Sequence, residues 1–211
     1  MTIDLYTWVT ANSQKVNIAV CELDLDVDVH PINIGKGEQH EPAYLKVNPN
    51  NKVPAIVDSE TGIRMFESGA ILMYLGERTG RLMPEDPAAR WEATQWIFWQ
   101  MAGLGPVAGQ LNHFAADEAR GTYARDRFRA ELQRLVGILE GQLVGRDYVA
   151  GSYSMADIAL WPGISRYERL GLDLGDYPNL RGWYRRIAGR EAVQCGFEML
   201  QPGRSPPLPP A

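Results

Sequence analysis

The chain has 211 residues, 45% of them hydrophobic and 22% charged, which is ordinary for a folded globular protein and enough for one large domain or two smaller ones. Its formal net charge of −5 argues against nucleic acid or an anionic membrane as the main partner, because both need a basic surface. No signal-like start and no run of roughly 18 apolar residues is present, so we expect a cytoplasmic protein without a membrane span.

The first eighty residues alternate strand and helix patterns. Residues 3–6 predict a strand, 16–23 a helix and 27–31 a second strand, a unit that requires parallel pairing and a right-handed crossover. A loop over 35–39 and a short helix over 42–47 lead to a hairpin, with strands over 54–58 and 62–66, and to a closing helix over 68–78. This βαβ-ββα order is that of a thioredoxin-like domain, which we place at residues 1–80.

Every segment after a proline-interrupted stretch over 81–87 has helical periodicity, and we expect an all-helical domain over 88–200. A helix from 90 to about 114 should bend near Gly103–Pro106, and a second should run from 123 to about 143. Ser154 and Asp157 predict a capping box before a helix that is apolar on nearly every side and therefore central. Residues 201–211 form a proline-rich tail, extended or mobile. The predicted fold class is α/β followed by all-α.

The two cysteines, Cys21 and Cys195, stand far apart and in no CxxC or metal-ligand spacing. The sequence therefore predicts neither a disulfide nor a zinc site, and we expect both side chains to be buried fillers. No metal, nucleotide or flavin motif is found. Any thiol chemistry would then use a sulfur that arrives with a ligand.

Two short motifs lie close together and suit one peptide-like ligand. If the Val53–Pro54 bond is cis, the main chain of Val53 is left free to pair with an extended ligand. Ser68 begins the closing helix, whose unpaired amides and positive dipole suit a carboxylate, while Glu67 would accept an ammonium group. Either motif alone could be an ordinary strand start or helix cap.

These residues resemble the glutathione transferase superfamily, and the resemblance covers nearly the whole chain. In that family the cis-proline strand binds the cysteinyl backbone of glutathione and a Glu-Ser pair binds its γ-glutamyl group, which implies these roles for Val53, Glu67 and Ser68. By position, Gln39 and Lys52 would reach the glycyl end, with Lys52 offering a positive charge to its carboxylate. A solvated loop lysine is the alternative for Lys52.

The loop after the first strand should supply the donor to the glutathione sulfur, and it contains no cysteine. The Thr-x-Asn spacing of Thr10 and Asn12, together with the stretch over 95–106, resembles the bacterial Nu-type branch, whose better known members reduce disulfides with glutathione. The resemblance implies that the Thr10 hydroxyl or amide and the Asn12 amide stabilise the thiolate and so lower its pKa. Tyr6, expected within the strand, and Ser13, a possible helix cap, are the rival donors.

The second substrate should meet the helical domain, where Asn112 and Arg134 are candidates. The Arg134 guanidinium could hold a carboxylate of a second glutathione, or it could be one of several solvated helix charges. His113 is expected to be a packed or surface residue rather than a base, because an ionised sulfur needs none.

Three functions remain open at this point. The first is a homodimeric enzyme that uses glutathione as co-substrate, without metal, nucleotide or flavin, to reduce small-molecule disulfides. The second is a transferase that conjugates glutathione to a carbon electrophile through the same loop. The third is a non-catalytic binding module of the same fold, because fold alone does not imply activity.

Overall fold

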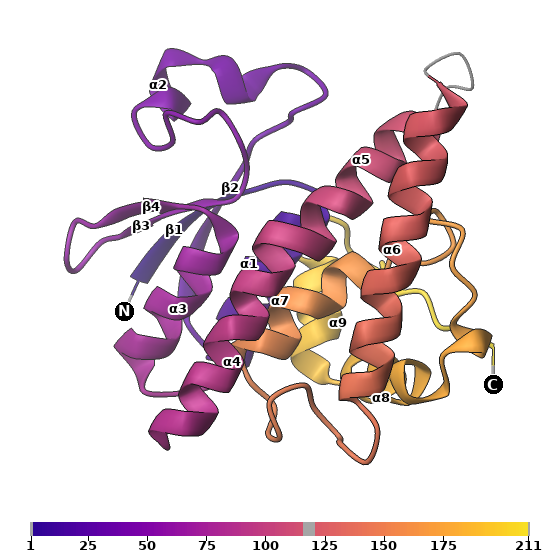
Figure 1. Ribbon diagram of the computed structural model, residues 1–211. Coiled ribbons are helices and arrows are strands. Elements are labelled where there is room, and N and C mark those ends of the chain that lie inside the picture. Colours follow the sequence, from indigo (N-terminus) through magenta and orange to yellow (C-terminus); the bar gives the residue numbers. More distant parts are fainter. Residues whose placement is uncertain (1, 116–120, 211) are drawn as a thin grey trace. The chain divides into compact units, whose positions relative to one another are not determined.

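The structure, a computed structural model, describes residues 2–115 and 121–210 (Figure 1). The chain divides into two compact units: the first comprises residues up to Met83 together with Gly189–Pro206, and the second comprises Pro84–Ala188 and the residues from Pro207. Within the described residues, no helix has the length and apolar character needed to cross a membrane.

The first unit has the predicted βαβ-ββα order. Its elements are β1 (Thr2–Thr7), α1 (Ala11–Glu22), β2 (Asp26–Pro31), η1 (Glu38–His40), α2 (Pro42–Leu45), β3 (Ala55–Asp58), β4 (Arg64–Phe66), α3 (Ser68–Thr79) and α9 (Glu191–Glu198). The strand order is β2-β1-β3-β4, with β1 parallel to β2 and antiparallel to β3. This is a thioredoxin-like sheet, and it confirms the predicted fold class for this part of the chain.

Alternating residues of β1 explain how the sheet forms its core. Ile3 and Leu5 are fully buried, while the residues between them are partly exposed, as expected for a strand with one covered face. Helices α1 and α3 pack against each other and contribute buried side chains such as Val16, Ile71 and Leu72. The first residues of α1 and α3 are therefore held in place by the packing of these two helices.

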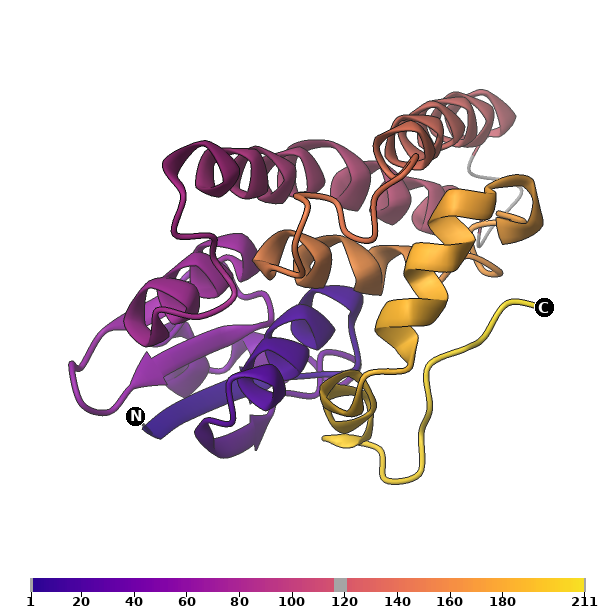
Figure 2. The same cartoon turned by 90° about the horizontal axis from the view of Figure 1, so that it is seen from below.

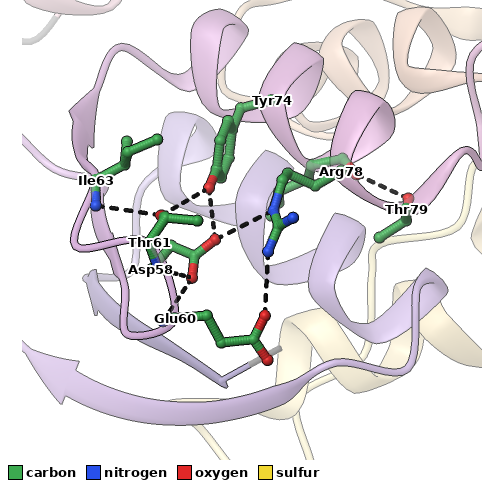
Figure 3. A network of polar contacts seen from close by, with 8 residues as sticks. Asp58, Glu60, Thr61, Ile63, Tyr74, Arg78 and Thr79 are labelled. Carbon is green, nitrogen blue, oxygen red and sulfur yellow. Dashed lines mark hydrogen bonds and ion pairs between the residues drawn. The ribbon is translucent and has the colours of Figure 1, made fainter.

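A polar network ties the β3–β4 turn to α3 (Figure 3). The fully buried carboxylate of Asp58 accepts the amides of Glu60 and Thr61, at 2.9 and 3.3 Å, and the hydroxyl of Tyr74. Arg78 lies 3.4 Å from the same carboxylate and 3.1 Å from Glu60. Burial by itself would raise the pKa of Asp58, but these hydrogen bonds and the guanidinium hold it below its ordinary value. The network fixes α3 against the hairpin that precedes it.

Helix α9 belongs to the first unit, whereas the sequence analysis placed its residues in the helical domain. Figure 2 shows the golden α9 beside the indigo α1. The two helices approach closely at Gly196, where an added Cβ would lie 2.8 Å from the backbone nitrogen of Ile18. Only glycine fits this contact without displacement of the backbone.

Cys21 and Cys195 form a disulfide between α1 and α9, with their Cα atoms 6.3 Å apart. The prediction that no disulfide forms was wrong, and so was the expectation of two buried fillers, because Cys21 is half-buried and Cys195 is exposed. Local sequence holds no signal for a bond across 174 residues. The packing of α9 on α1 brings the two sulfurs together.

The second unit is helical, and its elements follow the predicted order. They are α4 (Pro87–Trp99), the π-helical turn η2 (Gln100–Leu104), α5 (Gly105–Ala115), α6 (Thr122–Gln142), α7 (Met155–Ile164), η4 (Leu174–Asp176) and α8 (Pro178–Ala188). The interruption predicted near Gly103–Pro106 is this π-helical turn. At Gly105 an added Cβ would lie 2.9 Å from the end of the Gln100 side chain and 3.1 Å from the Gln100 carbonyl oxygen, so glycine relieves a tight approach within this turn.

Helix α7 is buried along nearly its whole length, as predicted. Its capping box is present: the Asp157 carboxylate accepts the Ser154 amide at 3.0 Å, while the Ser154 hydroxyl accepts the Ala156 amide at 3.3 Å. Asp157 also accepts the indole N–H of Trp183 at 2.8 Å and the amide of Val149 at 3.0 Å. Burial raises the pKa of this carboxyl to about 6.

The proline-rich tail has no regular secondary structure, in agreement with the prediction of an extended segment. It is nevertheless attached to α8. The Tyr184 hydroxyl donates to the carbonyl of Pro207 at 2.6 Å, and Pro209 is buried. The end of the described chain therefore helps to cover the helical unit.

Candidate functional site

A pocket of about 140 Å³ lies in the first unit, where α1, β3 and α3 begin. It is lined by Asn12, Asn48, Asn50, Lys52, Val53, Pro54, Glu67 and Ser68. Among these are six of the residues that the sequence analysis selected: Asn12, Lys52, Val53, Pro54, Glu67 and Ser68. Segments that are as much as 56 residues apart in the chain thus meet around one small volume.

The Val53–Pro54 peptide bond is cis, which confirms the hypothesis made from the sequence. Neither the amide nor the carbonyl of Val53 makes a hydrogen bond to any described residue. The preceding carbonyl, that of Lys52, is held instead by the Tyr44 hydroxyl and by the Asn48 side-chain amide at 2.6 Å. The main chain at Val53 is therefore fixed in place and still able to pair with an extended ligand.

Glu67 is the N-cap of α3 and has a positive φ, with φ 71° and ψ 108°. A non-glycine residue adopts such a conformation at an energetic cost, and residues of this kind cluster at functional sites. Its carboxylate is exposed and does not cap the helix. The next residue, Ser68, is the first of the helix and is buried. The pair presents a free carboxylate beside a helix N-terminus, which suits a ligand that carries both an ammonium and a carboxylate.

Lys15 contacts two of the residues that line this pocket and is 1% exposed. Its ammonium donates to Asn12 Oδ1 at 2.9 Å and to Ser68 Oγ at 3.4 Å. Burial lowers the pKa of Lys15 from 10.5 to about 7, an effect that the nearby Glu67 carboxylate partly opposes. A positive charge held away from water next to the pocket favours an anion inside it.

This lysine also determines which way the Asn12 side chain faces. An ammonium can only donate hydrogen bonds, so it selects the oxygen of the amide and turns the –NH₂ group away from itself. The Asn12 –NH₂ makes no hydrogen bond within the described part of the chain, and Asn12 lines the pocket. Lys15 thus leaves a donor on Asn12 for a ligand atom.

Thr10 is engaged in the local structure. It is the N-cap of α1: its hydroxyl accepts the Ser13 amide at 3.0 Å and lies 3.0 Å from the Ser13 hydroxyl. Its amide donates to the carbonyl of Trp8 at 2.8 Å. The rival donor Ser13 is fully buried at the third position of the helix, and Tyr6 lies within β1 as expected. Asn12 is therefore the better placed of the two predicted sulfur donors.

The other predicted residues do not line this pocket. Gln39 is in η1, and its buried Oε1 accepts no hydrogen bond from a described residue. Asn112 and Arg134 lie in the second unit, on α5 and α6. The Arg134 guanidinium makes two hydrogen bonds to Glu131, at 2.6 and 2.8 Å, on an exposed helix face. This is the solvated-charge alternative that the sequence left open for Arg134.

One cluster in the described residues has donors close enough for a metal ion. Asp4, Asp28 and His30 bring ligand atoms within 4.8 Å of one another on β1 and β2. His30 Nε2 is already 2.9 Å from Asp4, and its ring stacks on Tyr6 with centroids 4.7 Å apart. Local pairing accounts for these groups, and we assign no metal to them.

Sequence reasoning missed Lys15, although a signal was present. Asn12 and Lys15 are three residues apart, so a helix that begins near Ala11 places them on one face. A lysine between otherwise buried helix positions is rare in proteins unless its charge is compensated. Asn48 and Asn50 were also missed, because their role depends on the path of the loop before Pro54.

Comparison with known proteins identifies the family. The description "Glutathione S-transferase, N-terminal domain" matches residues 1–77, and "Glutathione S-transferase, C-terminal domain" matches residues 122–186. The chain belongs to the glutathione S-transferase family. It is similar to the disulfide-bond oxidoreductase YfcG of Escherichia coli, with 41% identity over 199 residues that cover 90% of this chain and 92% of YfcG.

Solved structures of this glutathione S-transferase family give the same result. A glutathione transferase from Burkholderia graminis, described with two glutathione molecules bound per subunit, has a TM-score of 0.89 and 38% identity, covering 96% of this chain and 90% of its own. One from Pseudomonas putida, described with one glutathione disulfide bound per subunit, has a TM-score of 0.90 and 34% identity, covering 96% and 92%.

Proposed function

We propose that this protein binds glutathione in the pocket at the start of α3 and uses the bound thiolate to reduce small-molecule disulfides. The observation that carries the proposal is the arrangement of Lys15 and Asn12, which offers an N–H donor and a nearby positive charge without any protein cysteine in the pocket. The names of its relatives, a disulfide-bond oxidoreductase and transferases described with glutathione or its disulfide, support the same reaction class.

In this proposal three groups hold the tripeptide. The main chain of Val53 pairs with the cysteinyl residue, as a single added strand residue. The Glu67 carboxylate accepts the α-ammonium of the γ-glutamyl group, and the amide end of α3 at Ser68 receives its carboxylate. Lys52 and Gln39 are proposed to reach the glycyl carboxylate and its amide. These contacts leave the sulfur near the Asn12 –NH₂ group.

Asn12 and Lys15 are proposed to favour ionisation of the sulfur. A hydrogen bond and an opposite charge both stabilise the charged form, and the pKa of a free thiol, about 8.5, then falls toward neutral. We propose that Thr10 also contributes to ionisation of the sulfur. Its main role in this proposal is to cap α1 and thereby to position Asn12.

The reaction needs two glutathione molecules. The bound thiolate attacks one sulfur of the disulfide, the sulfur–sulfur bond breaks, and the departing thiolate takes up a proton. A second glutathione thiolate then attacks the glutathionyl sulfur of the resulting mixed disulfide, which gives glutathione disulfide and a second thiol. Asn112 and Arg134 are proposed to contact the second glutathione or the substrate, which for Arg134 would require exchange of its Glu131 partner.

We further propose a homodimer and a cytoplasmic location. The dimer is supported by large apolar side chains on one exposed face of α4, where Trp91 is 71% and Phe98 is 60% exposed. The location is supported by the reaction itself, since turnover requires a supply of reduced glutathione, which cells keep in the cytosol.

The test is turnover of 2-hydroxyethyl disulfide with glutathione, followed through glutathione reductase and its loss of NADPH. We expect a rate well above the spontaneous exchange rate, and an Asn12→Ala variant that retains its fold should lose most of it. No rate above the spontaneous one would overturn the proposal. If conjugation of chlorodinitrobenzene is much faster than disulfide reduction, the protein is a conjugating transferase instead. If neither reaction occurs but glutathione binds, it is a binding module.

A further inference from the structure

The disulfide between α1 and α9 lies on the first unit, and neither of its cysteines lines the pocket at α3. Cys195 is an exposed residue and Cys21 is half-buried, so Cys195 is the more open of the two cysteines to a dissolved thiol. Exposed disulfides that meet a thiol pool are in general labile or regulatory, whereas structural ones resist reduction. The exposure of this disulfide therefore suggests a role in thiol–disulfide exchange rather than a purely structural one.

A pocket of about 460 Å³ opens beside the disulfide. It is lined by Cys21, Glu22, Arg190, Glu191, Ala192 and Cys195. This volume lies within the range of small-molecule sites and is larger than that of the pocket at α3. A small thiol therefore has room to approach the sulfur–sulfur bond.

We propose that the Cys21–Cys195 disulfide is a thiol–disulfide exchange site for glutathione, and that Cys195 is the residue that becomes glutathionylated. A glutathione thiolate attacks the sulfur of Cys195 because this cysteine is the more exposed residue of the pair. The Cys21–Cys195 bond breaks, its electron pair leaves on Cys21 as a thiolate, and that thiolate takes up a proton. A second glutathione thiolate attacks the glutathionyl sulfur and releases glutathione disulfide, so that both cysteines end as thiols. The reverse sequence closes the bond.

Opening this bond loosens α9 without freeing it. Arg190 at the start of α9 makes two hydrogen bonds to the Glu22 carboxylate, at 2.6 and 2.9 Å, and Asn17 donates to the Gly196 carbonyl at 3.4 Å. None of these contacts involves a cysteine side chain, so we expect them to persist after reduction. The disulfide adds a covalent closure at the C-terminal end of α1, the helix whose first turns carry Asn12 and Lys15.

The exchange site is independent of the proposed reaction at α3. Attack on Cys195 uses a glutathione thiolate that forms in solution, and no residue of the α3 pocket takes part. An Asn12→Ala variant is therefore expected to exchange at Cys195 at the wild-type rate even when its turnover of 2-hydroxyethyl disulfide is lost. Failure of one proposal can in this way be told apart from failure of the other.

The experiment equilibrates the whole protein in buffers of increasing ratio of glutathione to glutathione disulfide, blocks free thiols with N-ethylmaleimide, and maps both cysteines by mass spectrometry. We expect the disulfide at low ratios, a glutathionyl group on Cys195 at intermediate ratios, and two blocked thiols at high ratios. Cys21→Ser should accept glutathione at Cys195 readily, whereas Cys195→Ser should be modified at least tenfold more slowly at Cys21.

The reduced protein should also differ from the oxidised one in α9. We expect faster amide hydrogen exchange in residues 191–198 and a melting temperature lower by roughly 5–15 °C, because a cross-link that closes a long loop restricts the unfolded chain. The Cys21→Ser/Cys195→Ser double variant should match the reduced protein in both measurements. The proposal fails if millimolar glutathione opens the bond only in denaturant, if the mixed disulfide forms on Cys21, or if oxidation with glutathione disulfide never closes the bond.

Discussion

Replacement of Lys15 by methionine separates the energetic cost of the buried ammonium from its use in the pocket. Methionine has a similar length and no charge, so it should fill the same space in α1. In the folded protein the pKa of Lys15 is about 7, against 10.5 for an ordinary lysine. Between these two values the unfolded chain binds more protons than the folded protein, so Lys15 makes the free energy of unfolding rise with pH.

The expected size of this effect follows from the two pKa values. Burial of the charge costs roughly 4–5 kcal/mol at pH 6, where the folded group is protonated, and roughly 2 kcal/mol at pH 9, where it has largely lost its proton. The hydrogen bonds to Asn12 and Ser68 offset roughly 1–2 kcal/mol of this at either pH. Lys15→Met should therefore be more stable than the wild type by about 3 kcal/mol at pH 6 and nearly equal to it at pH 9.

Urea unfolding at several pH values between 6 and 9 measures this difference directly. The exposed Lys36 provides the control, and Lys36→Met should follow the wild type throughout. A stability difference between Lys15→Met and the wild type that stays constant across this range would refute the reasoning. The same variant should bind glutathione with a thiol pKa about one unit higher, because the positive charge next to the pocket is gone.

Three further predictions concern the pocket and the helical unit. Asn12→Ala should lower kcat/KM for disulfide reduction at least tenfold and raise the pKa of the bound thiol, which the pH dependence of thiolate absorbance reports; an unchanged pKa would exclude Asn12 as the sulfur donor. Ser68→Ala should weaken glutathione binding by about 1–2 kcal/mol in titration calorimetry, since it removes a polar contact at the start of α3; equal affinity would place the γ-glutamyl group elsewhere. Asp157→Ala should lower the free energy of unfolding by about 3 kcal/mol, because the buried indole N–H of Trp183 and the amides of Val149 and Ser154 lose their acceptor. A loss under about 1 kcal/mol would contradict this.

At the pocket beside α3, local sequence predicted backbone features, but it did not by itself predict the roles of the residues. Pro54 stands directly before β3, and Glu67 directly precedes an apolar helical run, so neighbours in the chain strongly bias the backbone at both places. The cis bond and the helix start at Ser68 were predicted on that basis. The roles of these residues came from resemblance to a family, and the geometry is consistent with them.

Prediction was weaker wherever a side chain serves two purposes. Thr10 and Asn12 were selected together as sulfur donors, but the Thr10 hydroxyl caps the first turn of α1 and the Thr10 amide donates to the carbonyl of Trp8 before the helix. Arg134 was selected for a ligand carboxylate and is paired with Glu131. In each case the sequence supplies a suitable group, and the competition for its hydrogen bonds becomes visible only in three dimensions.

The sequence by itself determined the elements and their order, because strand alternation, helical periodicity, prolines and capping residues act over a few neighbouring positions. It also led to the hypothesis of a cis bond at Val53–Pro54 and to the predicted helix start at Ser68. Tertiary structure alone decided that Lys15 is buried against Asn12 and Ser68, and that α9 returns to α1 so that Cys21 meets Cys195. Burial, charge and disulfide pairing depend on contacts between segments that are distant in the chain, and the packing of the whole unit sets these contacts.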